Sequence, residues 1–253
     1  MRSIDINSDL GESFGNWTMG DDTALIPLIT AANVACGFHA SDPITMIGTV
    51  ETCKANGVAV GAHPGLPDLL GFGRRVMKIT PEDGYAYVLY QAGALKSVAE
   101  SRGLELHHVK PHGAFYTILR DDDELAAAFV QAVKDLMPRP AVYWPDFTDA
   151  SLPREARKAG VRVVHEVYVD LEYRADGSLI LQRQKVPADL VRARAQIRRW
   201  IEDGVVLAAD GTLVSVQAES VCIHGDGPNA VELTQAVRAE VEACGCVVAP
   251  LVN

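Results

Sequence analysis

The chain has no Lys/Arg-rich run that offsets its acidic residues. Its 33 acidic side chains outnumber its 23 lysines and arginines, which gives a formal net charge of −10. Binding to a nucleic-acid backbone requires a basic patch, so we expect no nucleic-acid partner. No apolar run approaches the roughly 18 residues of a membrane-spanning helix, and the first residues, MRSIDINSDL, lack the apolar segment of a secretion signal. We therefore expect a cytoplasmic protein without membrane contact.

Cysteine is scarce, and three common fingerprints are missing. The five cysteines are an odd number and form no CxxC pair, so we expect reduced thiols without disulfides or structural zinc. The chain has neither the GxxxxGK[ST] of phosphate-binding loops nor the GxGxxG of dinucleotide folds. It also lacks the GxSxG of serine hydrolases. Sequence motifs alone therefore predict no nucleotide site and no serine nucleophile.

The chain is long enough to form a large core. It has 253 residues, 48% of them hydrophobic, and no Pro/Ser-rich linker divides it. We expect one domain over residues 1–253.

Six short apolar runs end in clusters of Gly, His, Asp, Glu or Asn. They are Ile4–Glu12, Asn33–Asp42, Val60–Pro67, Val109–Gly113, Val164–Asp170 and Val221–Asp226. Helix signals lie between them, such as Asp42 before Pro43, with Gly57 as the stop. In parallel α/β folds the chemistry lies at the carboxyl ends of the strands. Because ionisable groups follow nearly every strand, we predict an irregular, TIM-like (β/α) barrel of about seven strands rather than an open sheet.

Two segments interrupt the alternation of strands and helices. Ala175-Asp176-Gly177, within Glu172–Arg183, and Ala209-Asp210-Gly211 are typical of hairpin turns. Between them, Ala188–Glu202 has the pattern of a basic amphipathic helix.

Polar residues alternate along the first strand. Asp5, Asn7 and Asp9 therefore share one face, which in a barrel is the inside. A buried carboxylate must be paired, hydrogen-bonded, metal-bound or neutral. Glu12, just beyond the strand, can reach the same pocket, so either Asp9 or Glu12 is the expected acid/base. The alternative is that these carboxylates only cap loop backbone or face solvent.

Histidines close the second and third strands. Neighbouring parallel strands lie about 4.8 Å apart, so His39 and His63 are expected close together. With Asp9 they are candidate ligands of a divalent metal. Two histidines do not complete the usual three-ligand zinc site, so the alternative is a pair of neutral hydrogen-bonding or proton-carrying imidazoles.

Lysine and histidine flank a proline after the fourth strand. Lys110 is expected to polarise an amide oxygen or hold a phosphate, and a surface ion pair is the alternative. His112, or the backbone at Gly37 and Gly113, is a candidate oxyanion stabiliser.

Two further groups complete the candidate site. Arg74 and Arg75 follow a glycine-rich loop and are expected to clamp a carboxylate or phosphate, or else to fasten the loop to an acidic surface. His224 and Asp226 end the last strand before a helix, where His224 is a candidate proton shuttle or a structural histidine.

Several motifs resemble a known family. DINSDLGESFG, AANVACGFHASDP, GAHPGLPDLLGFGRR, YQAGAL, VKPHGAFY and HGDGPNAV are similar, in order and spacing, to motifs of the LamB/YcsF family, from about Ser3 to Arg238. The resemblance implies a barrel related to polysaccharide deacetylases and glycoside hydrolases. It also implies the A subunit of a bacterial 5-oxoprolinase, which opens 5-oxoproline to glutamate with B and C subunits as partners and ATP as co-substrate.

With the resemblance, the expected roles can be assigned. The expected catalytic residues are Asp9, Glu12, His63, Lys110, His112 and Asp226. The expected substrate-binding residues are Asn7, Asn33, Gly37, His39, Arg74, Arg75, Glu166 and His224.

The chain also departs from the family pattern. Ser41 stands where the family usually has glycine, and Leu171 stands where an arginine is expected. Leucine cannot replace a guanidinium as a fork for a substrate carboxylate, so a related lactam stays open as the substrate. Two competing functions also stay open, a metal-dependent deacetylase and a carbohydrate-binding or regulatory protein without catalysis. Self-association into a homo-oligomer is equally compatible with the sequence.

Overall fold

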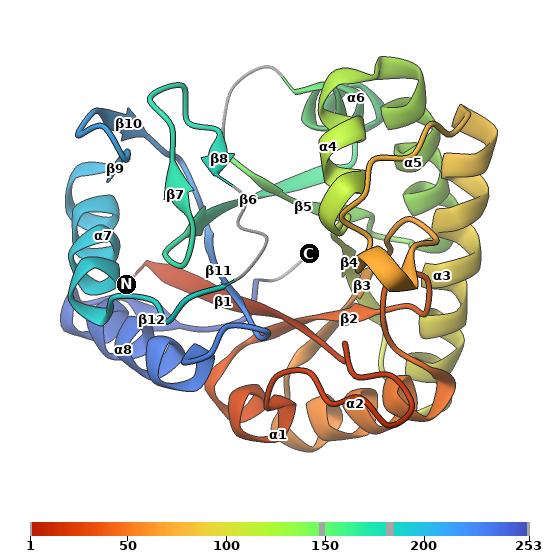
Figure 1. Ribbon diagram of the computed structural model, residues 1–253, viewed down its shortest axis with the longest axis horizontal. Helices are drawn as coiled ribbons and strands as arrows, with labels where there is room; N and C mark the ends of the chain where they lie inside the picture. The colour runs from red at the N-terminus through yellow and green to blue at the C-terminus, as the bar shows by residue number, and fades with distance from the viewer. Residues whose placement is uncertain (1, 147–149, 181–184, 252–253) are drawn as a thin grey trace.

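Seven parallel strands close into a barrel (Figure 1). The computed structural model describes residues 2–146, 150–180 and 185–251. The barrel strands are β1 (Ser3–Leu10), β2 (Ala31–Ala35), β3 (Ala59–His63), β4 (Leu106–Val109), β5 (Ala141–Pro145), β6 (Arg162–Tyr168) and β11 (Ser220–His224). They follow one another in that order around the sheet, and β11 pairs with both β6 and β1. The predicted seven-stranded barrel is confirmed.

The register around β1 places polar residues of three strands side by side. Asp9 lies opposite Asn33 of β2 and opposite His224 of β11. Since all these strands run in the same direction, their carboxyl ends meet at one rim of the barrel. A short strand, β12 (Val247–Val248), extends the sheet beside the start of β1, at the other end of that strand.

Helices surround the strands (Figure 1). They are α1 (Asp22–Leu25), α2 (Pro43–Asn56), α3 (Pro81–Ser101), α4 (Gly113–Asp121), α5 (Asp123–Leu136), α6 (Ser151–Ala159), α7 (Leu190–Asp203) and α8 (Ala230–Ala243), with 3₁₀ turns η1 (Ile26–Leu28) and η2 (Leu69–Gly71). The predicted start of α2 is confirmed, because Asp42 accepts hydrogen bonds from the backbone of Ile44 and Thr45. Its end is confirmed too, since Gly57 adopts the left-handed conformation with φ 68°.

Both hairpins form where the turn residues predict them. They are β7 (Glu172–Tyr173) with β8 (Leu179–Ile180), and β9 (Val205–Leu207) with β10 (Leu213–Ser215). The end of the predicted segment, including Arg183, lies outside the described residues. Large apolar side chains such as Trp144, Phe115 and Phe129 fill the space between strands and helices. Within the described ranges, no helix is long and apolar enough to span a membrane.

Candidate functional site

A pocket of about 320 Å³ opens at the rim where the barrel strands end. The predicted site residues that line it are Asp9, Glu12, His63, Arg74, Lys110, His112, Gly113, Glu166, His224 and Asp226. They come from strand ends or from the loops that follow, which is why a chain with polar clusters after each strand builds one pocket. Tyr116, Tyr168 and Leu171 add apolar surface.

Asp9 lies among three basic groups. Its carboxylate is 3.3 Å from His63 Nε2, 3.5 Å from Lys110 Nζ and 3.7 Å from His224 Nε2. Burial by itself raises the pKa of Asp9, but the adjacent imidazole of His63 and the ammonium of Lys110 outweigh burial and hold this pKa well below its usual range. Asp9 is therefore ionised at neutral pH.

Lys110 is buried and surrounded by acceptors. Its Nζ lies 2.9 Å from Glu166 Oε1, 2.9 Å from Cys222 Sγ, 3.3 Å from Asn7 Oδ1 and 3.5 Å from Asp9 Oδ1. Burial lowers the pKa of Lys110, but Asp9, Cys222 and Glu166 more than compensate, and the net pKa is well above the usual value. An ammonium has three donors. Its protons are already engaged, so Lys110 serves as the counter-ion of the pocket floor.

His63 and His112 have fixed tautomers. Nδ1 of His63 lies 2.8 Å from the carbonyl oxygen of Lys110, and Nε2 of His112 lies 2.8 Å from the carbonyl oxygen of Phe72. A carbonyl oxygen only accepts, so both of these nitrogens carry the ring proton. The other two, Nε2 of His63 and Nδ1 of His112, face each other at 3.0 Å. In neutral rings both are lone-pair nitrogens.

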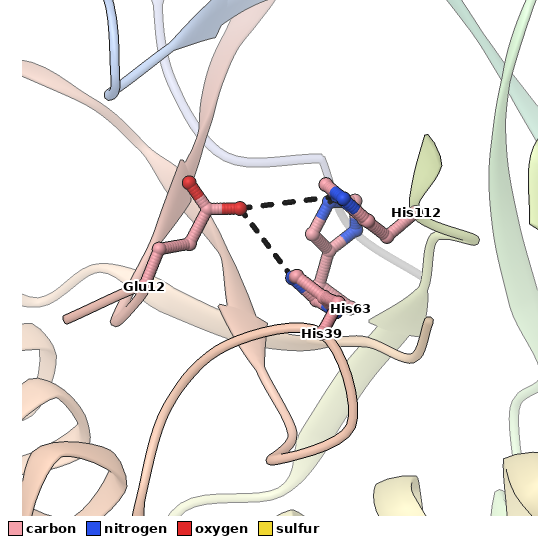
Figure 2. Close-up of side chains that lie close together, drawn as sticks. All are labelled: Glu12, His39, His63 and His112. Carbon is pink, nitrogen blue, oxygen red and sulfur yellow. Dashed lines mark hydrogen bonds and ion pairs between the residues drawn. The ribbon is translucent and has the colours of Figure 1, made fainter. Parts of the chain in front are cut away.

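Glu12 and His39 complete what we call the imidazole cluster: Glu12, His39, His63 and His112 (Figure 2). Oε1 of Glu12 lies 3.4 Å from Nε2 of His39 and 3.8 Å from Nδ1 of His112. The His39 ring stacks on that of His112 with 3.7 Å between centroids. Neither Glu12 Oε1 nor either nitrogen of His39 has a hydrogen-bond partner among the described residues, although all three atoms are buried.

The electrostatics of this cluster depend chiefly on burial. Burial, together with the carboxylates of Asp9 and Asp226, raises the pKa of Glu12 well above its usual value. Burial and neighbouring imidazoles lower the pKa of His39 and of His112 well below the usual range. Glu12, His39 and His112 are thus uncharged in the absence of a cation.

A second set of side chains, which we call the ionic group, consists of Arg74, Asp170, Lys185, His224 and Asp226. Arg74 and Lys185 both pair with Asp226, at 3.1 and 2.5 Å. Nδ1 of His224 lies 2.7 Å from Asp170 Oδ2. Burial raises the pKa of Asp170, but His224 and Lys185 outweigh burial and lower it to about 2.

The other predicted site residues lie outside the pocket lining. Asn33 donates hydrogen bonds to Asn7 and Asp9, so both asparagines form a layer beneath the floor. The backbone N–H of Gly37 already donates to Ala40. Arg75 pairs with Asp68, which fastens its own loop rather than reaching the pocket.

Three side chains that the sequence did not single out belong to the site. Asp170 lies in the polar cluster that follows β6. Its position after a barrel strand could therefore have indicated that it belongs to the site. His108 lies beneath the pocket floor, against Tyr143 and 2.6 Å from Asn33 Oδ1. It stands two residues before Lys110, so strand alternation was available as a signal that favours it over His107. Lys185 lies between β8 and α7 in the chain rather than after a barrel strand, and only the folded chain brings it to the pocket.

The comparisons with known proteins agree with this architecture. A sequence model described as the LamB/YcsF family matches residues 4–253. The chain belongs to the LamB/YcsF family. It is 46% identical over 248 residues to the A subunit of 5-oxoprolinase from Bordetella pertussis, covering 97% of this chain and 98% of that relative. It is 50% identical over 247 residues to the second 5-oxoprolinase A subunit of Bordetella bronchiseptica, with the same coverage.

A solved structure of similar length has the same fold. The crystal structure of a lactam utilization protein from Thermus thermophilus superposes with a TM-score of 0.91 at 43% identity, covering 99% of this chain and 100% of that one. The LamB/YcsF barrel described above is therefore matched along its full length.

Proposed function

We propose that this chain is the ring-opening subunit of an ATP-dependent 5-oxoprolinase and that it hydrolyses the cyclic amide of 5-oxo-L-proline to L-glutamate. The relatives' names support the substrate and the multi-subunit complex. The observation that carries the proposal is the position of Asp9: a carboxylate at the floor of a pocket of about 320 Å³, between Lys110 and two imidazoles.

The chemistry explains why ATP and partner subunits enter the proposal. A five-membered lactam has little ring strain, and its amide nitrogen is a poor leaving group. Phosphorylation of the amide oxygen by ATP converts the ring carbon into an activated acyl centre for water. We assign ATP and the B and C subunits to the complex on the family resemblance, since the sequence has no phosphate-binding loop.

The proposed roles follow from the contacts of each side chain. Asp9 accepts a proton from the water as it adds to the activated ring carbon, and the C–N bond breaks when this adduct collapses. A second water then hydrolyses the resulting acyl phosphate, which releases glutamate and phosphate. Lys110 keeps Asp9 charged and oriented. His224, held by Asp170 through Nδ1, presents Nε2 toward Asp9 and can carry a proton to the departing nitrogen. Asp226 acts through the cations that it positions.

The ionic group is the proposed site of the substrate carboxylate. Leu171 lines the pocket and is only 8% exposed, so no guanidinium is supplied from that position. Lys185 and Arg74 line the same pocket and both pair with Asp226, and Lys185 also lies 3.7 Å from Asp170. A substrate carboxylate can pair with these cations by exchanging with the aspartates.

A second candidate is hydrolysis of a related lactam without the carboxylate. It is favoured by the apolar Leu171 in the pocket lining and by the relative named for lactam utilization. A panel of lactams with and without the ring carboxylate, assayed under identical conditions, separates the two candidates.

The deciding experiment is co-expression with candidate B and C subunits, followed by an assay of glutamate release from 5-oxoproline with and without ATP. We expect release only with the partners and ATP together, and loss of release with Asp9→Asn. Vigorous turnover by the isolated chain without ATP would contradict the proposal. Full activity of the complex with Asp9→Asn would contradict the role of Asp9.

A further inference from the structure

The orientation of His63 and His112 is unfavourable for two neutral rings alone. Each ring donates its only proton to a backbone carbonyl, to that of Lys110 and that of Phe72 respectively. Their lone-pair nitrogens then face each other at 3.0 Å, in a buried setting where water does not screen the repulsion. Such a contact becomes favourable when a cation accepts both lone pairs.

Glu12 and His39 direct further unsatisfied atoms to the same place (Figure 2). Their side chains are only 5% and 0% exposed, and Glu12 Oε1 and His39 Nε2 lie 3.4 Å apart without a hydrogen bond between them. Buried polar atoms are normally satisfied. The unpartnered oxygen and nitrogen lie beside the two facing lone pairs of the other rings. Together the four atoms indicate a missing cation that would accept an electron pair from each of them.

We propose that Glu12, His39, His63 and His112 bind one divalent transition-metal ion. The four ligand atoms all lie within 4.8 Å of one another, and the measured pairs are separated by 3.0, 3.4 and 3.8 Å. Four ligands at about 2.0–2.1 Å from a tetrahedral ion are about 3.3 Å apart, so small side-chain shifts are sufficient for coordination.

The donor set selects the class of ion. Three imidazoles and one carboxylate suit Zn²⁺ and its first-row neighbours, whereas Mg²⁺ and Ca²⁺ prefer sets made of oxygen. The carbonyl partners of His63 and His112 are also the outer contacts that metal-binding histidines usually have. Glu12, His63 and His112 line the pocket, so a bound ion would supply a Lewis acid to its wall.

Metal binding can be measured without any assay of ring opening. The chain is stripped with a chelator, titrated with ZnCl₂ by calorimetry, and titrated separately with Co²⁺ while visible absorption is recorded. We expect one ion per chain and a rise in melting temperature with added Zn²⁺. His39→Gln and His63→Gln should each weaken Zn²⁺ binding by about 100-fold or more, since each removes a direct ligand. A failure to bind Zn²⁺ would not contradict the proposed hydrolysis, because metal titration and the assay of glutamate release measure different quantities.

A matched control is His165→Gln. His165 lies on β6, with 24% of its side chain exposed, and is not part of the cluster. It should leave Zn²⁺ affinity within about 2-fold of wild type, as expected for a distant position. Equal losses in all three variants, or binding of less than one equivalent by wild type, would overturn the proposal.

A measurement on the unaltered chain covers the case in which the variants do not fold. X-ray absorption at the zinc edge should show nitrogen and oxygen ligands at about 2.0–2.1 Å with imidazole scattering. Sulfur ligands would overturn the assignment. So would an NMR signal from a proton shared between His63 and His112 that persists when Zn²⁺ is present in excess.

Discussion

The imidazole cluster and the ionic group hold their polar side chains in different ways. Side chains of the cluster are at most 6% exposed, and its fixed rings are held by backbone carbonyls. In the ionic group, Arg74 is 33% exposed, and side chains pair mainly with one another. Contacts to backbone keep geometry constant, whereas ion pairs can exchange partners with an incoming anion. The contrast suits the first region to holding a metal ion and the cations of the second to pairing with a substrate carboxylate, as proposed above.

The largest expected effect comes from Asp9, which lies between the two regions. Asp9→Asn removes the carboxylate that contacts His63 and His224, and we expect turnover of the reconstituted complex to fall by about 10²- to 10⁴-fold. Asp210→Asn, in the β9–β10 turn, removes an acid of the same size far from the pocket and should leave turnover unchanged. Equal effects of the two changes would remove Asp9 from the chemistry.

Lys110→Met tests how much the buried pair of Lys110 and Glu166 contributes to the stability of the fold. Glu166 is fully buried, and its carboxylate would lose the ammonium 2.9 Å away. Breaking a buried pair on one side costs about 3–5 kcal/mol, so chemical denaturation should show a loss of that size. The double variant Lys110→Met/Glu166→Gln removes the unpaired charge and should recover part of the stability. A single variant as stable as wild type would show that Glu166 finds another partner.

Asp170 tests the ionic group through pH. Its folded pKa of about 2 is below the unfolded value, so its contribution to stability is present above pH 4 and lost as pH falls toward 2. A shift of nearly two units corresponds to about 2–3 kcal/mol for this buried group. Asp170→Asn should therefore cost about that much at pH 7, and the difference from wild type should narrow below pH 4. A constant difference across that range would mean that the charge of Asp170 is not the cause.

Lys185→Met tests recognition of the substrate. Loss of one charge-assisted contact should raise the KM for 5-oxoproline by roughly 10- to 150-fold, with a smaller change in kcat. Adding Leu171→Arg to this variant returns a cation to the pocket lining and should restore part of the affinity. Lys158→Met, on α6 and paired only with Glu155 among the described residues, is the matched control. An unchanged KM in Lys185→Met would place the carboxylate elsewhere.

The smallest expected effect concerns Ser41, beside the imidazole cluster. Its φ of 78° lies in the left-handed region, where glycine is favoured. Ser41→Gly should raise the free energy of unfolding by about 0.5–1 kcal/mol, because relief of strain exceeds the added entropy of the unfolded chain. Thermal denaturation measures this change in stability. A lower melting temperature for Ser41→Gly would indicate that the hydrogen bond from the Ser41 hydroxyl to Asp42 stabilises the fold by more than the backbone strain destabilises it.

Much of the barrel could be predicted because its signals are local. Alternation of Asp5, Asn7 and Asp9 correctly places their side chains inside the barrel, where all three are buried. Helix α4 was not predicted as a separate helix. Only Asp122 separates it from α5, so the sequence pattern of α4 cannot be told from the start of the longer helix. The 3.0 Å approach of His63 to His112 depends on register and on one carbonyl in a distant loop, which sequence patterns do not encode.

The closing contact between β1 and β11 has a consequence for the order of folding. Asp9 pairs in register with His224, so the pocket requires two strands separated by most of the chain. Contacts of such large sequence separation form slowly, because a long loop must be closed before they contribute. During synthesis, β1 through β6 emerge from the ribosome well before β11. The nascent chain therefore exposes the unpaired edges of β1 and β6 until Ser220–His224 inserts between them, and this interval is when the chain is most open to aggregation or chaperone capture.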